Sequence, residues 1–181
     1  MLKNENSLFI ISMNLRCWIH PWSTNSKAAL LRRWWWKEYV EFIKKIDKVV
    51  FIFWWPDEKD DIENMKKELK DNKNVFFIEE SFLNSIAILN QVNLLICNDN
   101  WFWHIWAWLW IKVLSLWWTT NEKWSSPIWN NVVILKKTKE KSWYRYELKR
   151  EVPKWAKSWM DEIKVEDVLE KVKELEKFIL K

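Results

Sequence analysis

The chain has 181 residues and a net charge of +5 at pH 7, with 49% hydrophobic and 30% charged residues. These values are typical of soluble globular proteins and give enough length for one domain with a core, or for one half of a two-domain enzyme. No apolar run reaches the roughly 18 residues of a membrane-spanning helix, no signal peptide is visible, and no basic block points to nucleic acid. The modest basic charge leaves peripheral contact with an anionic membrane surface open.

The predicted elements alternate between strands and helices along the chain. We expect a first strand at 7–13 or, equally well, at 15–19, followed by strands at 48–53, 74–78, 92–97, 111–116 and 131–135. Helices are expected at 37–46, 57–71, 82–91, 101–110 and 164–181, the last being strongly amphipathic. Such alternation predicts an α/β fold, a Rossmann-like parallel sheet with helices on both faces. Residues 1–135 are expected to form the domain core, and 136–181 a polar connection and C-terminal helix of the same domain.

The two cysteines point to a reducing compartment. Cys17 and Cys97 stand far apart in the sequence and show no metal-ligand spacing. Intracellular proteins keep such thiols reduced, so we expect a cytoplasmic protein. No carboxylate pair is placed to hold a cation, and we predict neither a metal nor a cofactor.

The amino-acid usage is abnormal in one respect, because the chain has 19 tryptophans and no glycine. Average usage of about 7% predicts roughly a dozen glycines in a chain of this length. Many tryptophans also stand where turn chemistry favours glycine, as Trp54 and Trp55 do between a strand and Pro56. Five more lie between 101 and 110, where they would overfill the interface of a helix with the sheet.

We therefore interpret most of these tryptophans as occupying glycine positions of the functional protein. Two origins fit: a genetic code in which UGA encodes glycine, read here as tryptophan, or deliberate replacement. The alternative is a protein that is truly rich in tryptophan, with aromatic platforms for sugars, single strands or a membrane interface.

Polar residues gather in the loops that follow the predicted strands. In a parallel sheet these loops meet at one edge, where ligands bind. Ser23, Thr24 and Lys27 precede a helix and suit a phosphate. Glu58 follows the second buried strand, where a carboxylate can accept hydrogen bonds from a ribose. Asp99 follows another predicted strand, and a role as a simple helix N-cap explains it equally well. A lone His104 is more often structural than catalytic.

Read with glycine, the stretch from 98 to 120 becomes N-D-N-G-F-G-H-I-G-A-G-L-G-I-K-V-L-S-L-G-G-T-T. It resembles the Asp-Ser/Thr-Gly-x-x-His-x-x-x-x-x-Gly signature of glycosyltransferase family 9, the ADP-heptose:lipopolysaccharide heptosyltransferases. The segment HPWSTNSK is similar to the family's Pro-Gly-Ser loop with its phosphate-side lysine, and VVFIFWWPDE to its Gly-Gly-x-x-Glu turn. RRWWWKEYVEFI is similar to its Lys-Arg-Trp-Pro helix start, so Trp34 is expected to be a genuine tryptophan. The resemblance covers about residues 15 to 135.

The resemblance implies the C-terminal, donor-binding half of a GT-B fold. This half binds a nucleotide-diphosphate sugar resembling ADP-heptose, and the enzyme transfers the sugar with inversion to a lipopolysaccharide or other glycan or lipid-linked acceptor. The resemblance assigns the donor contacts to nine positions: Ser23, Thr24, Lys27, Glu58, Asp99, Asn100, Trp101, His104 and Thr120.

Three departures from the family pattern qualify this assignment. The acceptor half and its acidic catalytic base are absent from the chain. Asn100 replaces the usual Ser or Thr, which removes a hydroxyl contact. True tryptophans at Trp22, Trp101 and Trp103 would fill the donor pocket. A non-catalytic nucleotide-sugar-binding module and the fragment of a split gene therefore stay open as alternatives.

Overall fold

The computed structural model describes residues 16–20, 33–54, 58–89, 91–100, 102–117, 126, 128–137 and 160–179. Its centre is a six-stranded sheet in the order β3-β2-β1-β4-β5-β6, with every neighbouring pair parallel. The strands are β1 (Arg16–His20), β2 (Val49–Phe53), β3 (Val75–Ile78), β4 (Leu94–Asn98), β5 (Lys112–Leu116) and β6 (Val132–Leu135). The helices are α2 (Trp36–Lys45), α3 (Lys59–Glu68), α4 (Phe82–Leu89), α5 (Phe102–Trp108) and α7 (Val165–Ile179), with a 3-10 turn at Met160–Glu162.

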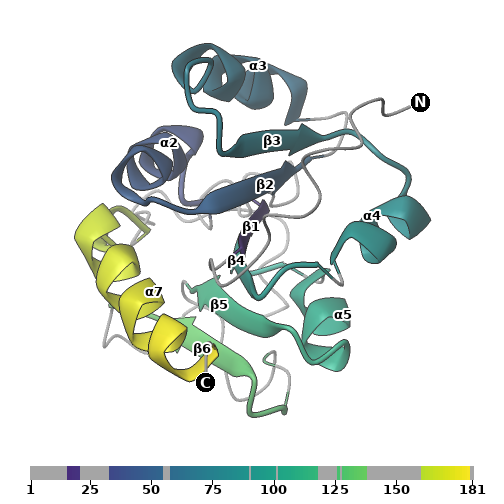
Figure 1. Ribbon diagram of the computed structural model, residues 1–181. Helices are drawn as coiled ribbons and strands as arrows, with labels where there is room; N and C mark the ends of the chain where they lie inside the picture. The colour runs from purple at the N-terminus through teal and green to yellow at the C-terminus, as the bar shows by residue number, and fades with distance from the viewer. Residues whose placement is uncertain are drawn as a thin grey trace, which may run out of the picture.

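Helices cover both faces of the sheet, as the alternating pattern predicts (Figure 1). β4 shows why both faces need a cover: successive side chains of a strand point to opposite faces of the sheet. Leu94 and Ile96 belong to the core cluster shared with α2, α3 and α7. Leu95 and Cys97 belong to the cluster shared with α5. A strand buried on both sides needs a continuous apolar run, and all five residues of β4 are buried.

The predicted elements match those observed, with boundaries shifted by a few residues. The first strand is the segment around 16–20, so the alternative at 15–19 is confirmed; the run at 7–13 lies outside the described residues. On α7, four buried residues recur at helical spacing, as the amphipathic pattern predicts: Val165, Val168, Val172 and Leu175. Within the described residues, no helix has the length and apolar character needed to cross a bilayer.

The tryptophans of α5 do not all face the sheet. Trp103 and Trp106 are buried, whereas Trp108 and Trp110 are 65% and 72% exposed. The expectation that the indoles crowd the helix–sheet interface is therefore wrong for the last two. The 3.6-residue period turns Trp108 toward solvent, and Trp110 lies beyond the last residue of α5.

The C-terminus of α5 has the backbone of a glycine-terminated helix. Trp110 has φ = 62°, the one positive value found among the described residues. The Trp110 N–H donates to Ala107 O at 3.1 Å and the Ile111 N–H to Trp106 O at 3.3 Å. These two bonds define a Schellman motif, whose left-handed position is usually glycine because a Cβ there is strained. Trp110 thus stands at a glycine position.

Replacing Trp110 by glycine is expected to raise the free energy of unfolding by about 1 kcal/mol, since a non-glycine residue in this region costs about 1–2 kcal/mol. Its exposed side chain contributes little burial in return. Trp108→Gly is the matched control: it is equally exposed but helical, so glycine should lower the free energy by about 0.5 kcal/mol. Urea denaturation measures both, and a loss of stability in the Trp110 variant would contradict the assignment.

Candidate functional site

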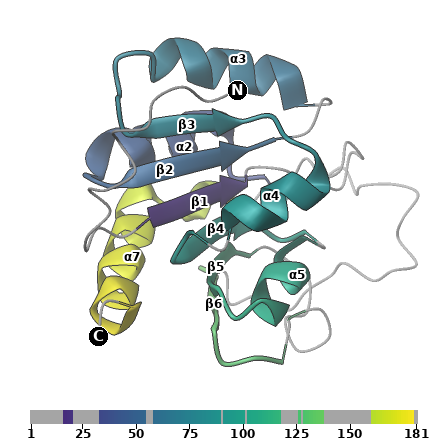
Figure 2. The same cartoon turned by 45° about the vertical axis from the view of Figure 1, so that its right-hand side comes forward.

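The strand order reverses direction between β1 and β4. From β1 the chain proceeds outward to β2 and β3, then crosses back to β4 and proceeds to β5 and β6. In open parallel sheets, ligands bind outside the carboxyl ends of the strands at this switch point. The carboxyl ends of β1, β2 and β3 point the same way (Figure 2). Asn98, Asp99 and Asn100 end or directly follow β4, so they occupy the switch point.

Asn98 holds the start of α2 against the end of β4. Its Oδ1 accepts from the Trp34 backbone N–H at 3.0 Å and from the Tyr39 hydroxyl at 3.3 Å. The Asn100 amide donates from Nδ2 to the Asn98 carbonyl oxygen at 3.1 Å, which turns the chain sharply after the strand. All of these atoms lie in buried residues. The backbone that carries Asp99 is therefore fixed from two sides.

Asp99 and His104 influence each other electrostatically. Asp99 is buried, at 7% exposure, while His104 lies on the outer side of the first turn of α5 with its ring 5.1 Å from that of Trp103. Partial desolvation lowers the pKa of His104, and the negative charge of Asp99 opposes this effect. The imidazole is therefore largely neutral at pH 7 and offers one donor and one acceptor. Asp99 also contributes to raising the pKa of the buried Cys97 thiol, after burial itself.

Glu58 lies at the same edge, directly before α3, and is 5% exposed. Its charge acts on Tyr39: burial first, then Cys97 and Glu58, raise the pKa of the Tyr39 hydroxyl well above its usual value. Tyr39 donates to Asn98. The buried Tyr39 thus bonds to the end of β4 and is also under the electrostatic influence of the predicted residue after β2.

Four predicted site residues are described, and all four lie at the carboxyl edge: Glu58, Asp99, Asn100 and His104. The other five, Ser23, Thr24, Lys27, Trp101 and Thr120, lie outside the described residues. Sequence reasoning missed Asn98 and Tyr39. Asn98 carries a local signal of a site residue, because it is an amide at the end of an apolar strand. Tyr39 carries no such signal, because its spacing is that of an ordinary core residue of a helix.

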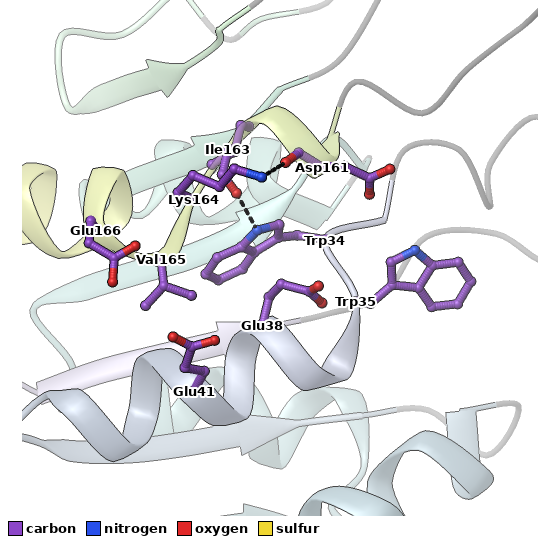
Figure 3. Close-up of a pocket in the computed structure, with 9 residues that line it drawn as sticks. All are labelled: Trp34, Trp35, Glu38, Glu41, Asp161, Ile163, Lys164, Val165 and Glu166. Carbon is purple, nitrogen blue, oxygen red and sulfur yellow. Dashed lines mark hydrogen bonds between the residues drawn. The ribbon is translucent and has the colours of Figure 1, made fainter.

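A separate pocket of about 400 Å³ lies between the start of α2 and the start of α7 (Figure 3). Four carboxylates line it, from Glu38, Glu41, Asp161 and Glu166, against one lysine, Lys164. This balance of charge repels phosphate groups. The pocket is therefore unsuited to a diphosphate.

Nothing in the described ranges forms a metal site. Groups of three or more His, Cys, Asp or Glu side chains that could hold an ion are not found there. Cys17 and Cys97 are free thiols, and both are buried. Because they belong to the core clusters of opposite faces, the sheet separates them.

The strand order and the two helical layers define the class of Rossmann-like α/β domains. No protein-family model matches the sequence, and no curated protein matches it. Solved structures of glycosyltransferases match its fold.

The E. coli ADP-heptose lipopolysaccharide heptosyltransferase II superposes with a TM-score of 0.72 at 14% identity, over 91% of this chain and 47% of that one. A family 9 glycosyltransferase from Veillonella parvula gives 0.66 at 16% identity, over 91% and 47%. The E. coli heptosyltransferase WaaC with ADP gives 0.64 at 12% identity, over 89% and 44%. The chain thus spans about half the length of the structures it matches. At the level of the fold, the predicted resemblance to the C-terminal half of a GT-B heptosyltransferase is confirmed.

Proposed function

We propose that the chain is the donor-binding half of a glycosyltransferase of the heptosyltransferase type. The observation that carries the proposal is the position of Asp99 and Asn100. They lie at the switch point of a sheet whose fold matches heptosyltransferases, one of them solved with ADP. The donor is a nucleotide-diphosphate sugar similar to ADP-heptose.

The described residues suit the polar parts of such a donor. The carboxylates of Asp99 and Glu58 accept hydrogen bonds from sugar or ribose hydroxyls. The neutral His104 donates to a phosphate or sugar oxygen. Ser23, Thr24 and Lys27 are proposed for the diphosphate, because they follow β1 in the sequence, β1 ends at the same edge of the sheet, and lysine supplies the positive charge. Trp101, as glycine, and Thr120 complete the proposed set.

In the proposed reaction the sugar moves with inversion to a lipopolysaccharide or other glycan or lipid-linked acceptor. The base that activates the acceptor belongs to the other half of the GT-B fold. The donor-binding half, which is the present chain, stabilises the charge that develops on the leaving diphosphate through Lys27 and backbone N–H groups. The proposed setting is the cytoplasm, with contact at the inner face of the membrane where the acceptor is lipid-linked.

The second reading is a non-catalytic nucleotide-sugar-binding module, which would use the same donor-side residues. A tryptophan-rich platform for sugars or membranes needs indoles exposed on one face. Five of the described indoles are instead buried: Trp34, Trp54, Trp103, Trp106 and Trp117.

The test is binding of ADP and ADP-sugars to a protein in which every tryptophan except Trp34 is replaced by glycine, joined to its upstream half. Asp99→Ala in that protein is expected to weaken binding of the ADP-sugar about 10- to 100-fold, the range for losing a charged hydrogen bond. Isothermal titration calorimetry gives the affinities.

Asp47→Ala is the control, since Asp47 is exposed and precedes β2 at the opposite edge of the sheet. It should leave the affinity unchanged. Absence of nucleotide-sugar binding in a folded protein would overturn the proposed function. Binding without sugar transfer to any acceptor would favour the module.

A further inference from the structure

The described tryptophans differ in how well the structure accommodates an indole. Trp34 is 2% exposed, and its Nε1 donates to Ile163 O at 2.9 Å. Its ring meets that of Tyr39 edge-on, with centroids 4.8 Å apart and planes at 79°. A buried Trp normally has a partner for its N–H and such an edge-to-face contact. Trp34 therefore fits as a native tryptophan.

At Trp54 and Trp110, the structure does not accommodate a tryptophan in this way. Trp54 follows the last residue of β2 and is 8% exposed, yet within the described residues its buried Nε1 has no hydrogen-bond acceptor. Leaving such a group unpaired costs about 1–3 kcal/mol. Trp110 adopts a left-handed backbone. Both are positions that suit glycine, one by its side chain and one by its main chain.

Trp103 and Trp117 fill the space at the carboxyl ends of β4 and β5. Trp103 lies in the first turn of α5, and Trp117 directly follows the last residue of β5. Each is 1% exposed, and their ring centroids are 4.9 Å apart with the planes tilted by 59°. The ring of Trp103 also contacts His104, which brings the pair next to the proposed donor site.

We infer that Trp103 and Trp117 close a ligand pocket, and that the ligand-binding form of the chain has glycine at both positions. The identification of this ligand as the nucleoside diphosphate part of the donor rests on the proposed function. Each indole buries on the order of 150–250 Å², so removing the pair opens a space for a planar ring. Its wall is the apolar cluster that includes Phe53 and Leu95, and His104 lies at its rim. An apolar wall with few polar groups at the rim is the usual form of a small-molecule site.

The experiment compares three proteins of full length. The first has glycine at every tryptophan except Trp34. The second also keeps Trp103 and Trp117, and the third, the matched control, keeps the exposed Trp108 and Trp110 instead. Calorimetry is expected to show ADP binding at least about 100-fold weaker in the second than in the first, and unchanged in the third. Equal ADP affinity in the first and second proteins overturns the inference.

Indole probes the same space independently of the nucleotide, because cavities left by deleted apolar side chains take up small aromatic molecules. The first protein should bind indole and the second should not. If no protein binds ADP but this difference in indole binding is seen, the proposed function fails and the pocket stands. No difference in indole binding and no ADP binding overturns both. Should the first protein fail to fold by circular dichroism, Trp103→Gly with Trp117→Gly in the parent chain gives the same comparison.

The gene offers a test that needs no folded protein. The inference expects UGA codons at positions 103 and 117, and also at 54 and 110, with UGG at position 34. UGG codons at positions 103 and 117 would overturn it.

Discussion

Replacing Trp34 by alanine is expected to lower the free energy of unfolding by about 3–5 kcal/mol, the usual loss for a buried aromatic side chain. The indole is 2% exposed and packs against Tyr39 and Phe42. Alanine would leave a cavity at this contact. It would also remove the donor that satisfies Ile163 O. Urea denaturation followed by circular dichroism measures the change.

Trp35→Ala is the control for this variant, since Trp35 is the neighbouring residue of the same type and is 38% exposed. Its loss is expected to stay below about 1 kcal/mol. Similar losses in the two variants would contradict the conclusion that the protein requires an indole at Trp34 and not at Trp35.

Asn98→Ala is expected to lower the free energy of unfolding by about 2–4 kcal/mol, because each buried donor left without an acceptor costs about 1–3 kcal/mol. The two donors are the Trp34 backbone N–H and the Tyr39 hydroxyl, both on the segment that begins α2. Losing them also releases the end of β4 from that helix. The same denaturation experiment measures the effect.

A double-mutant cycle with Tyr39→Phe separates the two hydrogen bonds. Phenylalanine keeps the ring in the core and removes only the hydroxyl. The double variant is expected to be more stable than the sum of the single losses predicts, by about 1 kcal/mol. Strict additivity would show that the Tyr39 hydroxyl does not depend on Asn98 for its partner.

The layered fold could be predicted from the sequence because its signals are local. β4 is an apolar run bounded by polar residues, and α7 has a stripe with helical spacing. The edge that carries Glu58, Asp99, Asn100 and His104 followed from the rule that parallel strands end together. Only the first strand was ambiguous, since two apolar runs lie close together before residue 20.

The contacts within the site could not be predicted in the same way. Asn98 meets Trp34 and Tyr39 across 64 and 59 residues of sequence, and such pairs depend on how helix and sheet pack. The tryptophans of α5 raised the same difficulty. Composition showed that they are unusual, but only the backbone at Trp110 and the ring contact of Trp103 with Trp117 showed which role each position has.

Trp34 makes two hydrogen bonds to segments that lie far apart in the sequence. Its main chain is bound to Asn98 at the centre of the sheet, and its indole to Ile163 just before α7, 129 residues further on. One residue therefore links the last helix mechanically to the strand end that carries Asp99. A displacement of α7 that moves Ile163 is therefore expected to shift Trp34 and, through Asn98, the end of β4.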